Sequence, residues 1–373
     1  MEERFSDLLL ILLIGESRIR VAKTLTIEEK PFSWEVSALV SVTTVIIVVC
    51  SLVVYNLAFA TVNQNGRQLV ITKASFLPEV NGHYSLSLIT ENQGEQTAAL
   101  ALKLQNQTFL AHSDAFTNPV ISRGETASYN SKIASVGHFD GSSGTVLVTN
   151  SASLNSTTLS VEFAFQYMSL APDNQMILGK GASSGNSFYF FDYRALGVLN
   201  DFVVYVNNTR YDQQLGDIFA LNSWYDVIFV LDGSSIDAYV NGNLVQSWQR
   251  AIKFEANNND LMIGSCVCGG YYFNGSIAFV RYYNRALTAA EATSNYEHSE
   301  SPVQDGLAMW LSFNSILNGN YVDLSGKGNV GIPTGGINQE SPIVRGLVYT
   351  VTVIGTNEKG FVYSTSKDLI AGL

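Results

Sequence analysis

The chain has 373 residues with a formal net charge of -11 at pH 7, and only 14% of its residues are charged. The acidic balance argues against nucleic acid as a partner, because lysine and arginine are needed to neutralise phosphates. Ordinary domains carry about 25% charged residues, so this surface must rely on neutral polar groups. Such a surface keeps its properties when carboxylates protonate, which would suit the acidic exterior of a thermoacidophilic archaeon; a Tyr-rich surface of any origin is the alternative.

Residues 36–65 contain no charged side chain. A helix rises about 1.5 Å per residue and must cross about 30 Å of hydrocarbon, so residues 36–62 are predicted to form a transmembrane helix. Five Lys and Arg residues precede this segment and only Arg67 follows it closely. The positive-inside bias therefore predicts that residues 1–35 are cytoplasmic and that the bulk of the chain is extracellular. A cleaved signal peptide is the rival interpretation, but its apolar region would be shorter and nearer the N-terminus.

Beyond the predicted anchor, the sequence pattern indicates β-structure. Period-2 alternation predicts strands over 69–76, 83–90 and 97–104, and 121–130 supplies one more. Near the C-terminus, 346–356 and 360–366 flank an Asn-Glu-Lys-Gly turn and predict a hairpin. Because an immunoglobulin-like β-sandwich needs about seven strands, we expect 66–130 and 343–373 to form one such domain, split in the sequence. A helix leading into a sandwich resembles the arrangement of archaeal pilin-like and adhesion proteins.

The central region carries two local signals. Asn241-Gly242 predicts a tight hairpin between 236–240 and 243–245, because both central positions of such a turn want positive φ. Thr288 and Glu291 form a T-x-x-E capping box that predicts a helix over 289–296. The segments 138–155, 158–165, 223–245 and 274–297 resemble successive signatures of the laminin-G-like branch of the concanavalin A-like jelly rolls. The resemblance implies a jelly roll with Trp224 as an aromatic plug of its core.

One signature of that family stands in an unusual position. The GLAMWLSF strand at 306–313 and the DLSGKGNVG loop at 323–331 follow the predicted helix, whereas the family places such segments before the FDG turn. A truncated second repeat and a circular permutation compete, and the absence of a second FDG segment favours permutation. A permuted domain over 133–338 would have its ends close together, as insertion into the split immunoglobulin-like sandwich requires.

Catalytic motifs are missing from the sequence. Jelly-roll glycanases use two carboxylates about 5–10 Å apart, often in an E-x-D-x-E run, and no such run occurs. The four histidines are scattered, and no H-E-x-x-H run is present. We therefore expect a binding protein and no enzyme.

Laminin-G-like domains often hold calcium at the sandwich rim, and the resemblance implies a site made by Asp323, Ser325 and Asn329 with Asp140 of the FDG turn. Oxygen ligands from loops suit such a hard cation. The family's tail often carries an acidic ligand where this chain has Ala278. The alternative is a turn in which Asp323 accepts hydrogen bonds from its own backbone.

Three cysteines are too few for a disulfide framework. Cys50 lies in the predicted span. Cys266 and Cys268 form a C-V-C pair for which two free thiols are favoured, with a local disulfide or a metal site as alternatives. Glycosylation sequons begin at Asn106, Asn155, Asn207 and Asn274.

Aromatic side chains that could stack on sugar rings occur as Tyr271 and Tyr272 beside a Gly-Gly pair, as Trp248, and in the FYFFDYR run at 188–194. Alternation would turn only half of such a run outward, so core packing is the alternative. We predict a membrane-anchored adhesin or lectin-like protein that binds a glycan or a surface protein. The alternative is a pilin-like or virion-associated subunit whose apolar helix packs in a filament core, although no basic-plus-small cleavage junction precedes Glu35.

Overall fold

The structure is a computed structural model that describes residues 12–14 and 17–19 and most of 69–372, with short gaps at 80–82, 95–96, 106, 108, 111–114, 171–173, 182–183, 195–196, 358–359 and 361. It has two units, Met1–Gln64 and Asn65–Leu373. In the first, β1 (Leu12–Ile14) pairs antiparallel with β2 (Ser17–Ile19). The predicted transmembrane segment 36–62 lies outside the described residues, and none of the helices that are described is long and apolar enough to span a bilayer.

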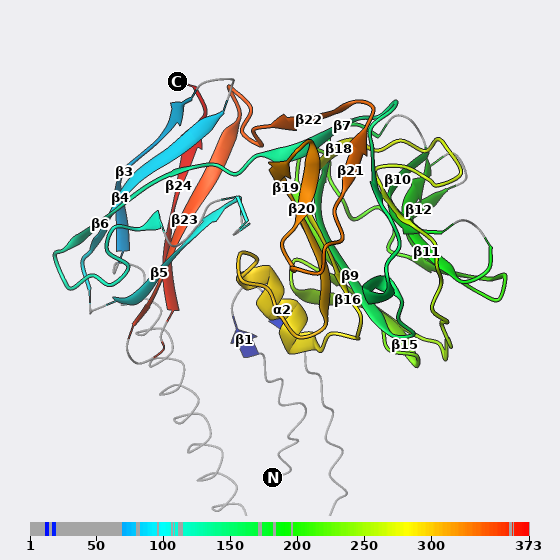
Figure 1. Ribbon diagram of the computed structural model, residues 1–373. Helices are drawn as coiled ribbons and strands as arrows, with labels where there is room; N and C mark the ends of the chain where they lie inside the picture. The colour runs from blue at the N-terminus through cyan, green and yellow to red at the C-terminus, as the bar shows by residue number, and fades with distance from the viewer. Residues whose placement is uncertain are drawn as a thin grey trace, which may run out of the picture. The chain divides into compact units, whose positions relative to one another are not determined.

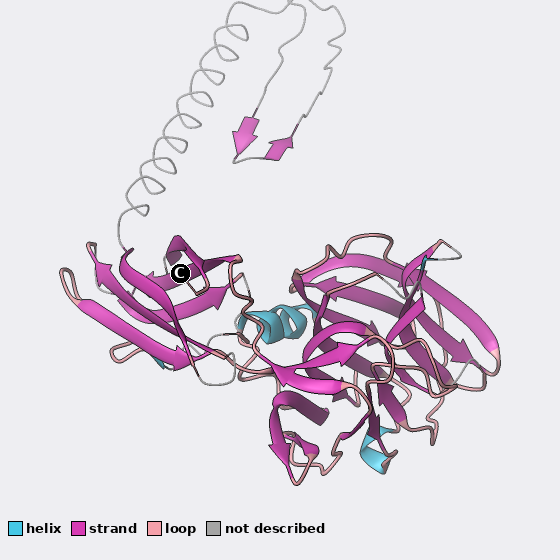
Figure 2. Cartoon of the chain, turned by 90° about the horizontal axis from the view of Figure 1, so that it is seen from above, coloured by secondary structure: helices cyan, strands magenta, loops and turns pink. Residues whose placement is uncertain are grey.

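The second unit is almost entirely β-structure, as the sequence predicts (Figure 2). Two three-stranded sheets, β24-β23-β5 and β3-β4-β6, combine segments from both ends of this unit. In β23 the alternating residues Tyr349, Val351 and Val353 are buried, and Val351 lies opposite Leu104 of β5. The six strands are β3 (Leu69–Pro78), β4 (Tyr84–Asn92), β5 (Thr97–Leu104), β6 (Thr126–Lys132), β23 (Val348–Asn357) and β24 (Val362–Ile370).

Between these segments the chain forms two larger facing sheets (Figure 1). A seven-stranded sheet has the order β13-β12-β11-β10-β17-β8-β21: β8 (Thr145–Val148), β10 (Asn174–Lys180), β11 (Ser187–Tyr193), β12 (Val198–Val206), β13 (Thr209–Gln214), β17 (Leu261–Ile263) and β21 (Ile332–Thr334). A nine-stranded sheet has the order β16-β15-β14-β9-β18-β19-β20, and β7 joins it by pairing with β18 and with β22. Its strands are β7 (Val136–Asp140), β9 (Leu159–Tyr167), β14 (Trp224–Leu231), β15 (Ser235–Val240), β16 (Asn243–Gln249), β18 (Asn274–Tyr283), β19 (Leu307–Leu317), β20 (Asn320–Asp323) and β22 (Ile337–Glu340). Their inward side chains form one apolar core, in which Phe202 and Phe229 stack with ring centroids 4.1 Å apart.

The late GLAMWLSF segment belongs to this same pair of sheets. It forms β19, which pairs with β18, and its side chains Met309, Leu311 and Phe313 enter the shared core. The following β21 pairs with β8 in the opposite sheet. Residues 306–334 therefore complete the sandwich built by 136–283 and do not start a second one.

The predicted helix and hairpin are both confirmed. Helix α2 (Ala289–Glu297) begins with the capping box of Thr288 and Glu291. Asn241 and Gly242 have φ of 50° and 74° in the β15–β16 turn. A Cβ at Gly242 would also lie 2.9 Å from the Tyr296 ring of α2, so packing against the helix adds a second reason for glycine.

Trp224 is buried in a core, as predicted, but it faces away from the core between the two large sheets. On β14, Val227 and Phe229 face the core, and the alternation of a strand turns Trp224 to the opposite side. There it meets Phe109, whose ring also contacts Phe279, with centroid distances of 5.4 and 5.5 Å. Gln107 Nε2 donates to the Trp224 carbonyl at 3.1 Å. Trp224 thus joins the outer side of the nine-stranded sheet to the core of the smaller sheets.

Candidate functional site

The outward side of the seven-stranded sheet carries a separate apolar cluster. Along β11, Phe188 and Phe190 enter the core while Tyr189 and Phe191 point away from it, as period-2 alternation requires. We call this layer the outer aromatic face and define it by these residues: Met176, Tyr189, Phe191, Tyr193, Val203, Tyr205 and Cys266. Apart from the partly buried Tyr193, these side chains are buried, with 9% or less of each exposed. The 188–194 run is therefore half core and half outward face, as the sequence predicts.

A charged group lies on the outer aromatic face. Arg210 of β13 is 5.9 Å from the Phe191 ring centroid, and its Nε donates to Asp212 Oδ1 at 2.6 Å. Its Nη2 is 3.8 Å from Asp201 Oδ2. The side chains of Arg210 and Asp212 are 41% and 42% exposed, whereas that of Asp201 is fully buried. The face thus offers an accessible guanidinium and carboxylate beside aromatic rings.

Asp201 and Asp212 form a coupled carboxyl pair. The pKa of Asp201 is raised to about 7, mainly by burial and then by the neighbouring carboxyl of Asp212, while the Gln213 N–H and Arg210 oppose the rise. Asp201 is buried and Asp212 is 42% exposed, so the pair presents one accessible carboxyl.

A second charged group lies at the end of β11. Arg194 is 2.7 Å from Asp192 Oδ2 and 3.0 Å from Asp217 Oδ1. Both arginines of this sheet are therefore placed between two aspartates each.

Of the predicted ligand-binding residues, Tyr271 and Tyr272 lie close to the outer aromatic face. Tyr271 is 42% exposed, and its carbonyl accepts a hydrogen bond from Met176 N at 2.7 Å. Tyr272 is partly buried.

Trp248 does not join Tyr271. It is partly buried against the interior core and pairs with Ile236 of β15. Ile236 lies opposite Leu231 of β14, which in turn lies opposite Leu159 at the start of β9. Tyr271 precedes β18, whose Gly275 pairs with Tyr167 at the far end of β9. The register places the two predicted residues at opposite ends of the sandwich, so they cannot hold one small ligand together.

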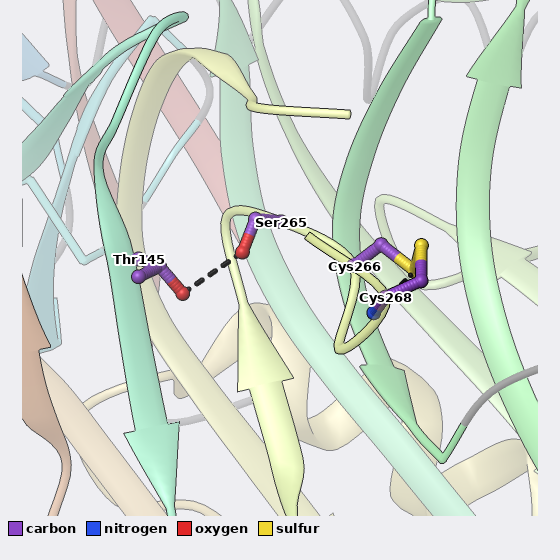
Figure 3. The surroundings of a disulfide bond; sticks show 4 residues. All are labelled: Thr145, Ser265, Cys266 and Cys268. Atoms are coloured by element: carbon purple, nitrogen blue, oxygen red, sulfur yellow. Dashed lines mark hydrogen bonds between the residues drawn. A yellow bond between two sulfur atoms is a disulfide. The ribbon is translucent and has the colours of Figure 1, made fainter. Parts of the chain in front are cut away.

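Cys266 and Cys268 form a disulfide, so the favoured prediction of two free thiols is wrong (Figure 3). Their Cα atoms are 5.0 Å apart, within the usual range for a bridge. The tight turn arises because Gly269 and Gly270 adopt φ of 77° and 103° and let Cys266 N donate to the Gly270 carbonyl. Ser265 Oγ donates to Thr145 Oγ1 at 2.9 Å beside the bridge. The disulfide thereby fixes the loop that borders the outer aromatic face.

The oxygens predicted to bind calcium are used by turns. Asp323 accepts hydrogen bonds from the backbone N–H groups of Trp310, Ser325 and Asn329 at 2.8–3.0 Å. Asn329 Oδ1 accepts from Ser151. In the described part of the chain, no group of three or more His, Cys, Asp or Glu side chains is placed to hold a metal ion. The described contacts of Asp323 and Asn329 are those of the turn-capping alternative.

Asp140 has the same role in its own turn. Its Oδ1 accepts from the N–H groups of Ser142, Ser143 and Gly144, and its Oδ2 from the hydroxyls of Ser142 and Ser143. Burial works to raise the pKa of Asp140, but these hydrogen bonds lower it well below its ordinary value. Ala278, where the family often has an acid, is buried beside Phe279 in the core that joins the smaller sheets.

We expect calcium to leave the melting temperature of the protein unchanged. Asp323→Ala should lower the free energy of unfolding by about 1–3 kcal/mol, because buried N–H groups lose their acceptor. Thermal melts with calcium and with a chelator check both statements. A melting temperature that rises with calcium in the natural protein, and does not rise in Asp323→Asn, would contradict the turn-capping role.

The sequons differ in accessibility. Asn207 is exposed at the turn between β12 and β13 with φ of 48°. Asn155 is partly buried and donates to Asn258 Oδ1 at 3.2 Å. Asn274 lies within β18, paired with Asp140, and Asn106 lies outside the described residues.

A second set of buried charges lies on the outer side of the nine-stranded sheet. Arg281 and Glu162 are fully buried and joined by a bond of 2.8 Å from Nη1 to Oε1. Asn295 of α2 donates to the other oxygen of Glu162 at 2.7 Å. The nearby Asp226 is 1% exposed, and neither carboxylate oxygen has a hydrogen-bond partner. This cluster is sealed under α2, so it is not a site for a ligand.

Replacing Asp226 with Asn should stabilise the protein increasingly as pH rises. Burial, followed by the charge of Glu162, raises the pKa of Asp226 well above its ordinary value, and Arg281 only partly offsets this. The unfolded chain releases this proton near pH 4 while the folded chain keeps it, so native stability falls as pH rises above that value. Tyr283 and Tyr296 also face the cluster.

We expect Asp226→Asn to gain at least about 1 kcal/mol at neutral pH and nothing near pH 3, since one pKa unit is worth about 1.4 kcal/mol. Denaturant unfolding at several pH values measures the difference, with the exposed Asp368→Asn as control. A gain that does not depend on pH would refute an elevated pKa.

Comparison with known families agrees with the two facing sheets. Residues 140–293 match the laminin G-like family described as the concanavalin A-like lectin/glucanases superfamily. No curated protein matches the chain.

Several solved structures are similar to it. A candidate carbohydrate-binding protein of Bacteroides ovatus shares 14% identity, with 73% of this chain and 98% of that one covered and a TM-score of 0.45. The CBM40 of the Ruminococcus gnavus IT-sialidase, bound to α2,3-sialyllactose, shares 14% identity over 43% of this chain and 96% of its own, with a TM-score of 0.35. Domains LG4-5 of the mouse laminin α1 chain share 12% identity over 59% and 84%, with a TM-score of 0.32.

Proposed function

We propose that this protein binds glycans through the outer aromatic face of its laminin-G-like sandwich and does not turn them over. The observation that carries the proposal is the exposed Arg210–Asp212 pair set beside Phe191 on that face. Sugars present an apolar C–H surface and a ring of hydroxyls, so they are recognised by aromatic side chains together with a few fixed polar groups. We expect this binding to need no calcium, because the carboxylates of Asp323 and Asp140 cap turns.

We further propose that residues 36–62 anchor the chain in a membrane with the sandwich outside the cell. In this proposal the smaller sheets form a split immunoglobulin-like domain from 66–130 and 343–373, and the jelly roll at 133–338 is a circularly permuted insertion. Two observations support the permutation: the family match covers 140–293, and β19 and β21 lie outside that match yet pair into the same two sheets. The filament-subunit alternative rests on the apolar segment alone, and no described contact favours it.

The test is a glycan array probed with detergent-solubilised full-length protein. We expect binding to defined sugars, and we expect Arg210→Ala and Asp212→Asn to weaken it by about tenfold or more, because hydrogen bonds to charged groups are worth about 1.5–3 kcal/mol. Asp368→Asn is the matched control, because it makes the same substitution as Asp212→Asn at an exposed aspartate of β24. Unchanged binding by both face variants would refute the assignment of the site.

A further inference from the structure

We infer that the outer aromatic face takes an uncharged glycan and rejects glycans that carry carboxylates or sulfates. This inference rests on the proposed function and adds the chemical class of the ligand. It comes from the way the cationic groups of the face are already paired.

Anionic sugars are usually gripped by a guanidinium that can offer two parallel N–H groups. On this face, Arg210 directs both Nε and Nη2 at Asp212 Oδ1, each at 2.6 Å, and lies within 3.8 Å of Asp201. Arg194 is held in the same way by Asp192 and Asp217. Each arginine is therefore neutralised by neighbouring aspartates before any ligand arrives.

The surrounding charge also disfavours an anion. On the face itself, Arg210 stands against the carboxyls of both Asp201 and Asp212, so the group has no spare positive charge. The other cation near this edge is Arg250, which lies over the ring of Tyr211 at 5.9 Å. Tyr211 packs against the interior core, so it and Arg250 lie on the opposite side of β13 from Arg210. An acidic sugar would meet carboxylates without a free counter-charge.

A neutral pyranose finds complementary groups instead. The half-exposed carboxylate of Asp212 accepts hydrogen bonds from hydroxyls, and the half-exposed Arg210 donates to them. The buried rings of Tyr189, Phe191 and Tyr205 lie beneath this pair and support it, while Tyr271, which is 42% exposed, offers a ring to the sugar nearby. Because the ligand has no charge, binding should depend little on salt, whereas recognition of an anion would weaken as salt rises.

The test compares neutral oligosaccharides of mannose, galactose and glucose with the same backbones carrying terminal sialic acid, glucuronate or sulfate. Full-length protein is used at low and high salt. We expect at least one neutral backbone to bind about tenfold or more tighter than its charged counterparts, with affinity that salt does not change.

A charge-switch variant sharpens the comparison. Asp201→Asn/Asp212→Asn removes both partners of Arg210, so it should lose neutral binding by about tenfold or more and reduce the discrimination against charged counterparts. Tighter binding of the charged series by the natural protein, lost on Arg210→Ala, would overturn this inference while leaving glycan binding intact. Silence across both series would overturn the proposed function itself.

Discussion

Replacing Lys180 with Met should lower the free energy of unfolding by about 3–5 kcal/mol, the usual cost of breaking a buried charged arrangement from one side. Lys180 is 1% exposed, and its ammonium is surrounded by five oxygens of four asparagines. From Lys180 Nζ the distances are 2.8 Å to Asn150 Oδ1, 3.5 Å to Asn155 Oδ1, 3.1 Å to Asn257 O, 3.0 Å to Asn257 Oδ1 and 2.7 Å to Asn259 O. Methionine fills the same space but leaves these acceptors without their donor.

The lysine connects three segments that are far apart in the sequence. It projects from β10 to the loop after β8 and to the loop before β17, whose Asp260 accepts from Asn150 N at 2.7 Å. Burial lowers the pKa of Lys180 to about 8, against the pull of Asp260, so unfolding is best measured near pH 6, where the ammonium is charged. The exposed Lys327→Met is the control, and an equal effect of both substitutions would show that the oxygens around Lys180 contribute no special stability.

A loss of similar size, about 3–5 kcal/mol at neutral pH, is expected for Arg281→Met, because Glu162 would remain buried without its counter-charge. The guanidinium also donates to the Ser299 carbonyl and lies 3.9 Å from the Phe279 ring centroid and 4.8 Å from that of Trp310. Burial raises the pKa of Glu162 even in the natural protein, and the charge of Arg281 is the main force opposing that rise. Without Arg281, the destabilisation should therefore shrink as pH falls through the ordinary range of a glutamate, where the unfolded chain takes up the same proton.

A double-mutant cycle separates the ion pair from simple packing. Glu162→Gln/Arg281→Met removes both charges, and we expect it to recover a large part of the loss caused by Arg281→Met alone. Urea unfolding of the four proteins at about pH 7 and at about pH 4 gives the coupling energy. Additive effects at both pH values would contradict a buried ion pair.

Sequence reasoning reached the fold through short-range signals. The Asn241-Gly242 turn and the Thr288 capping box are local features, and each fixed its element correctly. Alternation along 69–76 and 346–356 likewise gave strands close to β3 and β23. The side of the sheet on which Trp224 lies could be predicted from the sequence, because alternation along β14 puts residue 224 on the opposite face from Val227 and Phe229.

The candidate site could be predicted only in part. The 188–194 run was identified, but Asp201, Arg210 and Asp212 were not, since their meeting with Phe191 depends on the register of β11, β12 and β13. The oxygens around Lys180 depend on loops about 25 to 80 residues away in sequence. The family resemblance directed attention to Asp323 and Asp140 as metal ligands, although their surroundings in the fold make them turn caps.

Hydrogen–deuterium exchange of the full-length protein, with and without the neutral oligosaccharide that binds tightest on the array, tests the central claim most directly. We expect the ligand to slow exchange in 187–193 and 198–214, the strands that carry the outer aromatic face. Slower exchange confined to the turns at 140–144 and 323–331, with none in those strands, would contradict it.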